Sequence, residues 1–280
     1  MDASIDFIEL RHISKNYHEP ASETSALKDV SFTVVEGEFL AIVGPSGCGK
    51  STLLSIISSL LPPSGGQITI KGRLLDWDAQ KRDSPAAKRT EDSPAVVIGY
   101  MPQKDHLFEW RSILQNVYLG LEIQKKNTEE NRNFAENLLD RYGLRDFKNH
   151  RPNQLSGGMR QRAALIRTLA VKPDVLLLDE PFSALDYQTR LQVADAIYAI
   201  IKQEKKTAVL VTHDISEAVS MSDRVVVMSA RPATVKRIFD VRFAAPGRTP
   251  MKAREQPEFK DYFNDIWKEL DFHDDGELQP

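Results

Sequence analysis

The sequence predicts an α/β fold, in which helices cover both faces of a mostly parallel sheet. Continuous apolar runs at residues 39–43, 175–178 and 208–211 are typical of strands buried on both faces of a sheet. Apolar residues at helical spacing follow the first run and separate the other two. The two helical sets are Leu53, Leu54, Ile57, Leu60 and Leu61, which we expect to end at Pro62-Pro63, and Leu191, Ala194, Ile197, Ile200 and Ile201.

The N-terminal stretch has a different pattern. Apolar and polar residues alternate from Ile5 to Leu10 and again from Val30 to Val34. Alternation of this kind indicates strands that bury one face only. We therefore expect short, half-buried strands with exposed polar faces ahead of the parallel sheet.

Three further segments complete the organisation of the chain. Residues 105–155 are charged and predict a helical insert, and residues 76–94 are polar, without apolar period, and predict an exposed loop to which we assign no chemistry. Residues 259–270 predict a final amphipathic helix, which either packs on the body of the protein or offers a surface to a partner. The apolar stripes are Phe134, Leu138, Leu139 and Tyr142 in the insert, and Phe259, Phe263, Ile266, Trp267 and Leu270 in the final helix.

Composition and charge favour some classes of function over others. The net charge of -3 and the pI near 6.1 give no broad basic surface, so we expect no nucleic-acid partner. Cys48 is the only cysteine, which fits a reducing compartment such as the cytosol. The start of the chain lacks a signal-peptide pattern, and no apolar run reaches the roughly 18 residues that span a bilayer. We therefore expect any membrane role to come through a partner.

The most informative segment lies between the first buried strand and its helix. Successive backbone N–H groups at a helix N-terminus bind phosphate, and glycines let the backbone approach closely. Lys50 can reach the β and γ phosphates of a nucleotide, and the Ser51 hydroxyl can bind Mg²⁺. The whole predicted phosphate loop is Gly44, Pro45, Ser46, Gly47, Cys48, Gly49, Lys50 and Ser51.

Polar side chains also end the other two buried strands. Asp179 and Glu180 follow one strand and His213 follows the next, so all three are expected at the carboxyl edge of the sheet. We expect Asp179 to hold Mg²⁺, Glu180 to accept a proton from an attacking water, and His213 to donate a hydrogen bond near the γ phosphate. Taken alone, the two carboxylates could be solvated strand ends and the histidine could be structural.

A second anion-binding segment precedes another helical pattern. Ser156, Gly157 and Gly158 stand at the predicted N-terminus of a helix that contains Ala163, Ala164, Ile166 and Leu169. A simple helix cap would explain the serine alone. Because one nucleotide already has its cradle, a second site indicates a composite arrangement, in which this segment faces the nucleotide of another subunit.

With these motifs the chain resembles the nucleotide-binding subunit of ATP-binding cassette (ABC) transporters. That family's motifs occur in its order along the chain, and the combination is more specific than any single member. They are the Walker A loop at Gly44 to Thr52, the Q-loop Gln103, the signature at Leu155 to Met159, Walker B at Val175 to Glu180, the D-loop Ser183 to Asp186, the switch His213, and Tyr17 in the position of the aromatic that stacks on adenine.

The resemblance implies an ABC-type P-loop NTPase fold, with a RecA-like core, an antiparallel β subdomain and an inserted α-helical subdomain. Residues 1–240 would form the nucleotide-binding domain, with the helical part at about 105–156, and residues 241–280 a C-terminal extension. Two chains would pack head to tail with ATP and Mg²⁺ between Walker A and the opposite signature. Gln103 would join Glu180 and His213 in the catalytic set, contact Mg²⁺ and signal the nucleotide state to membrane subunits. Asp186 would belong to the nucleotide-binding set.

Two details resemble bacterial importers of the nitrate, sulfonate and taurine type. The signature ends in Met159 rather than the commoner glutamine, and residues 100–110 follow that group's pattern before the insert. This implies an ATP-hydrolysing subunit at the cytoplasmic face of the membrane, bound to permease subunits and indirectly to a substrate-binding protein whose cargo the sequence does not name. The alternatives are a cassette ATPase acting on DNA or ribosomes, and a small-molecule kinase, which would leave Gln103 and the signature unexplained.

Overall fold

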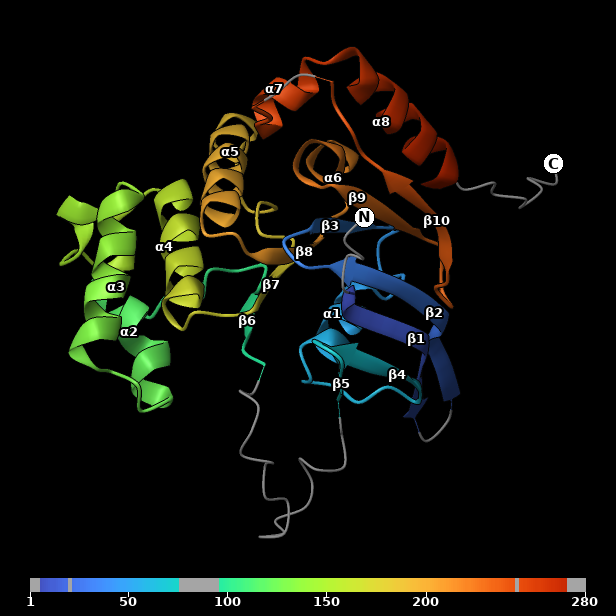
Figure 1. Ribbon diagram of the computed structural model, residues 1–280, viewed down its shortest axis with the longest axis horizontal. Coiled ribbons are helices and arrows are strands. Elements are labelled where there is room, and N and C mark those ends of the chain that lie inside the picture. Colours follow the sequence, from blue (N-terminus) through green and yellow to red (C-terminus); the bar gives the residue numbers. More distant parts are fainter. Residues whose placement is uncertain (1–5, 20–21, 76–95, 245–246, 271–280) are drawn as a thin grey trace, which may run out of the picture.

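The computed structural model describes residues 6–19, 22–75, 96–244 and 247–270, and is built around a six-stranded sheet (Figure 1). The strand order is β10-β9-β3-β8-β7-β6, and all pairs are parallel except β9 with β10. The strands are β3 (Phe39–Val43), β6 (Ile98–Met101), β7 (Val175–Asp179), β8 (Thr207–Val211), β9 (Arg224–Met228) and β10 (Val235–Asp240). The parallel sheet predicted from the apolar runs is therefore confirmed.

Each central strand divides its side chains between two cores. In β3, Phe39 and Ala41 pack on one side of the sheet, whereas Leu40 and Ile42 pack on the other. All five β3 residues are buried, because each face of the sheet is covered. This explains why the sequence shows a continuous apolar run here instead of an alternation.

The N-terminal strands form a second, antiparallel sheet in the order β2-β1-β4-β5. Its strands are β1 (Asp6–Glu19), β2 (Ser22–Val35), β4 (Gly65–Ile70) and β5 (Arg73–Leu74). The prediction of short strands was wrong, since β1 and β2 have 14 residues each. Register shifts and positive φ angles at His12 and Asp29 interrupt the β1–β2 ladder, so the apolar alternation breaks although the strands continue.

Helix α1 (Lys50–Ile57) packs against the inner face of both sheets. Its predicted extension to Pro62 was wrong. Ser59 adopts a left-handed φ of 62°, and the N–H of Leu60 turns back to the carbonyl of Ser55. The helix therefore ends before Leu60, whose side chain is 71% exposed although its spacing suggested a core position.

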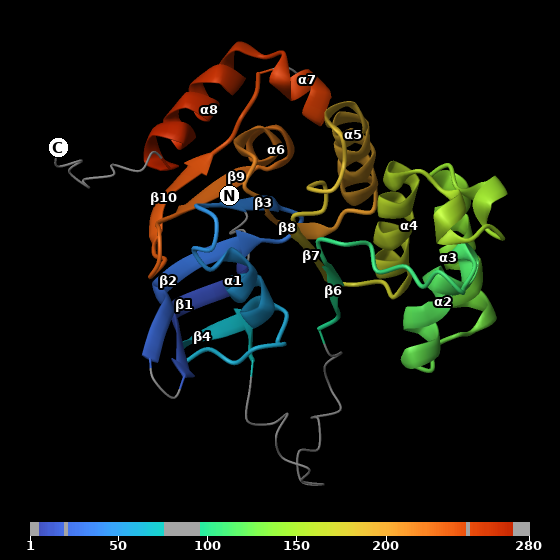
Figure 2. The same cartoon turned by 180° about the vertical axis from the view of Figure 1, so that it is seen from behind.

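Most of the remaining helices lie on the other face of the six-stranded sheet, as Figure 2 shows from behind. The insert packs beside α4, with Leu138 and Leu139 buried and Phe134 and Tyr142 partly buried, which confirms its predicted apolar stripe. The elements are α2 (Ile113–Ile123), α3 (Glu129–Arg141), η1 (Arg145–Phe147), η2 (Pro152–Gln154), α4 (Gly157–Ala170), α5 (Tyr187–Gln203), α6 (Ile215–Met221), α7 (Pro250–Arg254) and α8 (Pro257–Leu270).

The predicted C-terminal helix corresponds to α8, which contacts α6, β9 and β10. Ile266 is fully buried, whereas Trp267 remains 54% exposed. The helix thus packs on the body of the protein and also presents aromatic surface. The predicted loop at 76–94 lies outside the described residues.

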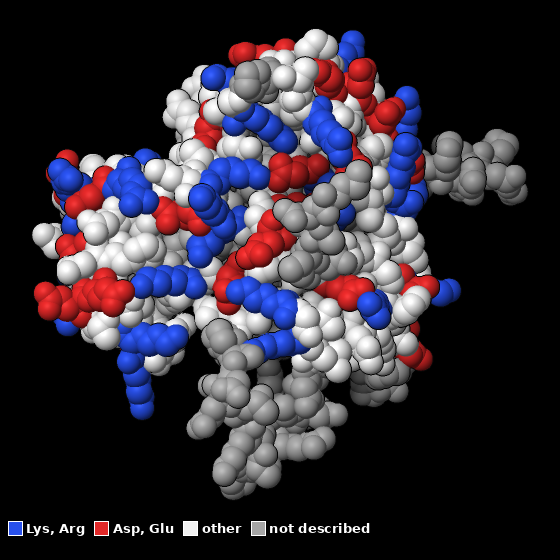
Figure 3. Space-filling model, viewed as in Figure 1, with Lys and Arg blue, Asp and Glu red and all other residues white. Residues whose placement is uncertain are grey.

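No helix among residues 6–270, leaving out the gaps named above, is long and apolar enough to cross a membrane. On the face seen in Figure 3, basic and acidic side chains are interspersed. Neither sign dominates this face, in keeping with the small net charge of -3.

Candidate functional site

The carboxyl ends of the parallel strands meet at one edge of the sheet. Asp179 at the end of β7 is in register with Val211 at the end of β8, and Ile42 near the end of β3 pairs with Val211 as well. The chain segments that leave these strands therefore begin side by side. This register brings together the phosphate loop, the Asp179-Glu180 pair and His213.

The phosphate loop turns from β3 into α1 through two glycines with positive φ. Gly47 has φ 71° and Gly49, the N-cap of α1, has φ 124°. A Cβ on Gly49 would lie 3.1 Å from the Ala26 carbonyl oxygen, so both conformation and space favour glycine there. Lys50 is 5% exposed, and its ammonium donates to the carbonyls of Gly44 and Pro45 at 2.8 and 2.9 Å. The loop thus wraps around one buried cation.

Asp179 is linked to the phosphate loop by side-chain hydrogen bonds. The Ser51 hydroxyl donates to one carboxylate oxygen at 3.2 Å, and the Tyr100 hydroxyl donates to the other at 2.9 Å. Burial raises the pKa of Asp179, while these two donors act in the opposite direction. Burial and the neighbouring carboxylate also raise the pKa of Tyr100, so this phenol stays a donor.

Glu180 is the centre of a second set of contacts. The Gln103 amide donates to Glu180 Oε2 at 3.3 Å and to Ser183 Oγ at 3.1 Å. His213 Nδ1 lies 3.2 Å from the same Oε2 atom. The structure therefore brings together the three residues that the sequence analysis assigned to catalysis, Glu180, His213 and Gln103.

The backbone of Glu180 is strained. Its φ of 44° lies in the left-handed region, which a glutamate rarely adopts, and its N–H donates to the Val211 carbonyl at 2.8 Å. Strain of this kind persists only where the surroundings impose it, and it gathers at functional sites. Here it holds the carboxylate out of the strand direction, toward Gln103 and His213.

A cavity of about 430 Å³ opens between the phosphate loop and these side chains. The cavity is lined by loop residues from Ser46 onward, by Glu180 and His213, and by Arg231. Arg231 follows β9 and its guanidinium donates to the Gly47 carbonyl at 2.6 Å. The lining residues are Ser46, Gly47, Gly49, Lys50, Ser51, Thr52, Glu180, His213 and Arg231.

Two residues near this cavity were absent from the predicted site. Tyr100 and Arg231 follow the same rule as the predicted residues, since one lies near the end of β6 and the other follows β9 at the same edge of the sheet. Considering the polar residues at or just after the end of every strand, including the strand before the insert, would have identified both. The sequence gives no sign of the pairing with Asp179 or Gly47, which depends on strand order.

Tyr17 lies on β1, beside the C-terminal part of the loop. Its hydroxyl is 3.3 Å from Thr52 Oγ1, and the Lys15 ammonium lies 5.4 Å from its ring centre. The ring is 39% exposed, so one side is open to solvent. This places an accessible aromatic side chain next to Thr52.

Ser156, Gly157 and Gly158 lie apart from this cavity. The Ser156 hydroxyl accepts the Met159 N–H at 3.3 Å as the N-cap of α4, and Ser156 is exposed. Asp186 is likewise exposed and caps α5 by accepting the Thr189 N–H at 3.1 Å. None of these residues lines the cavity, and in both views α4 and α1 lie on opposite sides of β6 and β7 (Figures 1 and 2).

Comparisons with known proteins identify the family of the chain. A family model described as ABC transporter matches residues 27–183. An uncharacterized ABC transporter ATP-binding protein of Bacillus subtilis, YtlC, is 45% identical over 95% of this chain and 96% of its own. The taurine import ATP-binding protein TauB of Pelagibacter ubique is 37% identical over 85% of this chain and 84% of its own.

A solved structure is similar as well. It is a dimer of the ATP-binding cassette MJ0796 in a post-hydrolysis state with ADP and Pi, which is 33% identical, has a TM-score of 0.67, and covers 84% of this chain and 99% of its own. The predicted α/β fold of an ABC-type nucleotide-hydrolysing protein is thereby confirmed. The chain belongs to the ABC transporter family and is one of its ATPases.

Proposed function

We propose that the chain powers an ABC importer of the nitrate, sulfonate and taurine type, as one of two identical ATPase subunits that pack head to tail. One observation carries the proposal. The phosphate loop, Glu180 and His213 surround one cavity, whereas Ser156 is exposed at a second helix N-terminus outside it. A second copy that places its Ser156 segment over the cavity would complete the anion site with backbone N–H groups.

Glu180 would act as the general base. A water in the cavity would donate its proton to Glu180 while its oxygen attacks the γ phosphorus and the bond to the β–γ bridging oxygen breaks. His213, 3.2 Å from Glu180, and Gln103, 3.3 Å away, would hold the carboxylate in position. Lys50 and the loop N–H groups would bind the charge that develops on the phosphates.

The residues present fit Mg²⁺. It prefers oxygen ligands and is commonly held by one or two carboxylates together with substrate phosphates. Ser51 Oγ and an Asp179 oxygen lie 3.2 Å apart, and Gln103, the third predicted ligand, donates a hydrogen bond to Glu180, the residue after Asp179. Among the described residues no group of three or more His, Cys, Asp or Glu side chains could hold a metal alone. The ion would neutralise phosphate charge when it binds with ATP.

Two more residues would contact the nucleotide in the closed dimer. Tyr17 would stack on adenine, and Asp186 would lie near the shared nucleotide. The helical insert, packed beside α4 and near Gln103 in sequence, would transmit the nucleotide state to permease subunits, with a substrate-binding protein acting beyond them. The subunit would therefore lie at the cytoplasmic face of the membrane without entering it. Similarity to TauB supports the importer type.

The decisive test combines Glu180→Gln with reconstitution. The variant keeps the binding contacts but lacks the base, so it should retain ATP, accumulate closed dimers on size-exclusion chromatography, and lose turnover by at least ~100-fold. Glu204→Gln is the matched control, because Glu204 pairs with Arg141 away from the cavity. Near-normal hydrolysis by Glu180→Gln would remove Glu180 from its role.

The transport assignment needs a separate measurement. Hydrolysis by the unaltered chain should increase when permease subunits and a loaded binding protein are present in liposomes. Stimulation by nucleic acid alone would overturn the importer proposal and favour the alternative ATPase class.

A further inference from the structure

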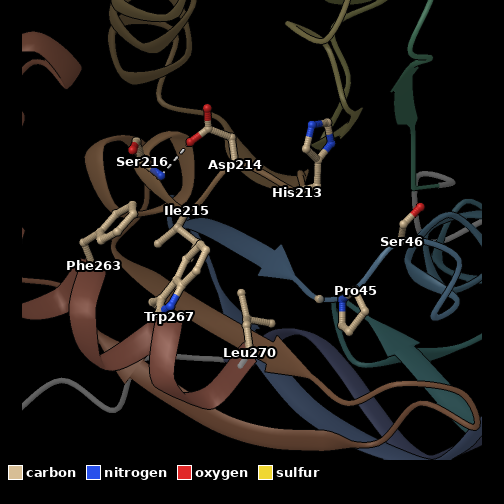
Figure 4. A pocket seen from close by; sticks show the side chains of 10 residues that line it. Pro45, Ser46, His213, Asp214, Ile215, Ser216, Phe263, Trp267 and Leu270 are labelled. Atoms are coloured by element: carbon tan, nitrogen blue, oxygen red, sulfur yellow. Dashed lines mark hydrogen bonds between the residues drawn. The ribbon is translucent and has the colours of Figure 1, made fainter. Parts of the chain in front are cut away.

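A second cavity, of about 480 Å³, lies between the phosphate loop, the start of α6 and α8 (Figure 4). One wall is aromatic, because Phe263 and Trp267 of α8 stack with ring centres 6.2 Å apart. Pro45 lies on the opposite side of the cavity, whereas Ile215 lies beside the two rings and Leu270 lies at the end of α8. The surface is mostly apolar, yet Trp267 is 54% exposed.

The rim of the cavity is polar. Asp214 accepts the Ser216 N–H at 2.7 Å with one carboxylate oxygen, and Arg190 approaches the other at 3.5 Å. His213 and Ser216 also line the opening. An occupant that matches this surface has a flat apolar body and a polar end, which is the chemistry of a tyrosine side chain.

The cavity is continuous with the nucleotide site. Ser46 and His213 line both cavities, so a partner that covers the phosphate loop would also reach the near edge of the second cavity. This continuity makes a second copy of the chain the natural occupant, since the proposed function already places one there.

The second copy would present the surface formed by its Ser156 segment and the start of its α5. The start of α4 lies against the start of α5, because a Cβ on Gly157 would come 3.0 Å from Leu185 Cδ2 and one on Gly158 would come 3.2 Å from Thr189 Cγ2. Tyr187 stands between Leu185 and Thr189 and is 67% exposed. Tyr187 would therefore lie next to the Ser156 segment at any surface on which that segment docks.

We propose that Tyr187 of one copy inserts into the cavity formed by Pro45, Ile215 and the α8 residues Phe263 and Trp267 of the other. The contact rests on the proposed head-to-tail dimer and deepens it, by giving α8 a share of the interface. Two-fold symmetry makes the contact twice per dimer, so one substitution removes both. The occupied cavity buries two aromatic surfaces that each chain alone exposes.

Dimer affinity provides the first test, in a Glu180→Gln background with ATP. Tyr187→Ala and Trp267→Ala should each raise the dimer dissociation constant about tenfold, measured by analytical ultracentrifugation, and the double variant should add little to either. Tyr187→Phe should retain most of the affinity. Trp110→Ala is the control, because Trp110 is 71% exposed ahead of α2 and does not line the cavity.

Cross-linking provides the second test and identifies the partner. Tyr187→Cys and Trp267→Cys chains with different tags are mixed and treated with a short bismaleimide. A product carrying both tags should form with ATP and not without it, and mixing excludes bonds within one chain. The Glu180→Gln chain without an added cysteine serves as the control for cross-linking through Cys48. Cys48 is only 1% exposed, so we expect little product from it. Trp110→Cys in place of Trp267→Cys should give no product.

The outcomes separate the two proposals. If the Glu180→Gln background forms no dimer with ATP, the proposed function itself fails. If the dimer forms, but both alanine variants dimerise like the background and no mixed product appears, only the Tyr187 contact is overturned. A competing occupant is the chain's own residues 271–280; dimer affinity that rises when the chain ends at Leu270 would favour them and contradict the proposal.

Discussion

At the scale of single residues, Asp179 is held between opposing influences. Burial disfavours its charge, whereas hydrogen bonds from Tyr100 and Ser51 favour it. A carboxylate that binds a cation must be ionised, so the donors matter for the proposed role of Asp179. Substituting Tyr100 changes only its hydrogen bond to Asp179. Substituting Ser51 would remove a proposed Mg²⁺ ligand as well as a hydrogen bond to Asp179.

Removing the Tyr100 hydroxyl should weaken Mg²⁺ binding. In Tyr100→Phe the ring stays, but Asp179 loses a hydrogen-bond donor and its pKa rises further. As the pH is lowered, activity should therefore begin to fall at a higher pH than in the unaltered protein. The half-saturating Mg²⁺ concentration for ATP hydrolysis should rise roughly tenfold. Tyr118→Phe is the matched control, since its hydroxyl donates to Glu136 in the insert at 2.6 Å. Identical Mg²⁺ titrations for the two variants would contradict this role.

At the scale of elements, the packing of α8 on the body includes one fully buried side chain. Ile266 is its one buried residue among those described, and it packs with the core that α5 and α6 also cover. The other apolar residues of the helix are partly exposed. The docking of α8, and with it the aromatic wall of the second cavity, therefore depends strongly on Ile266.

Ile266→Ala should lower the free energy of unfolding by about 3 kcal/mol, because the substitution leaves a void in a packed core. Ile123→Ala is a matched control, since Ile123 is 72% exposed and the same atoms are removed. Urea unfolding followed by circular dichroism gives both values. Equal stability of the two variants would show that α8 is not anchored at this position.

Strands and loops could be predicted where the apolar or glycine pattern of the sequence matches the surroundings of those residues in the fold. The buried runs that form β3, β7 and β8, and the glycines and Lys50 of the phosphate loop, follow from chemistry that is local in sequence. The length of β1 was not predictable, because bulges break the alternation, and the end of α1 depends on a left-handed Ser59. The contact of Tyr100 with Asp179 was hidden too, since it requires β6 to pair with β7.

At the scale of the whole molecule, Glu217 links folding to pH. It lies on α6, is 3% exposed, and accepts a hydrogen bond from Thr212 at 2.6 Å. Burial raises its pKa from 4.5 to about 7. The folded state therefore binds this proton more tightly than the unfolded state, so the contribution is fully favourable below pH 4.5 and is lost as pH rises through about 7.

Glu217→Gln should remove this dependence. The variant should gain on the order of 3 kcal/mol relative to the unaltered protein between pH 4.5 and 8, as measured by urea unfolding across the range. Glu136→Gln is an opposite control, because the hydrogen bond from Tyr118 lowers the pKa of Glu136 and its loss should not stabilise the protein at neutral pH. Parallel pH profiles for Glu217→Gln and the unaltered protein would contradict the assignment.

The exposure of Ser156 outside the cavity that contains Lys50 has a consequence for mixed populations. If the site is shared, a chain with Lys50→Ala and a chain with Ser156→Arg are each inactive alone but complement each other. Their mixed dimer carries both lesions in one site and leaves the other intact, so about a quarter of all sites recover after random mixing. Single-turnover hydrolysis would reveal this rescue, and its absence would mean that each chain carries its own complete site.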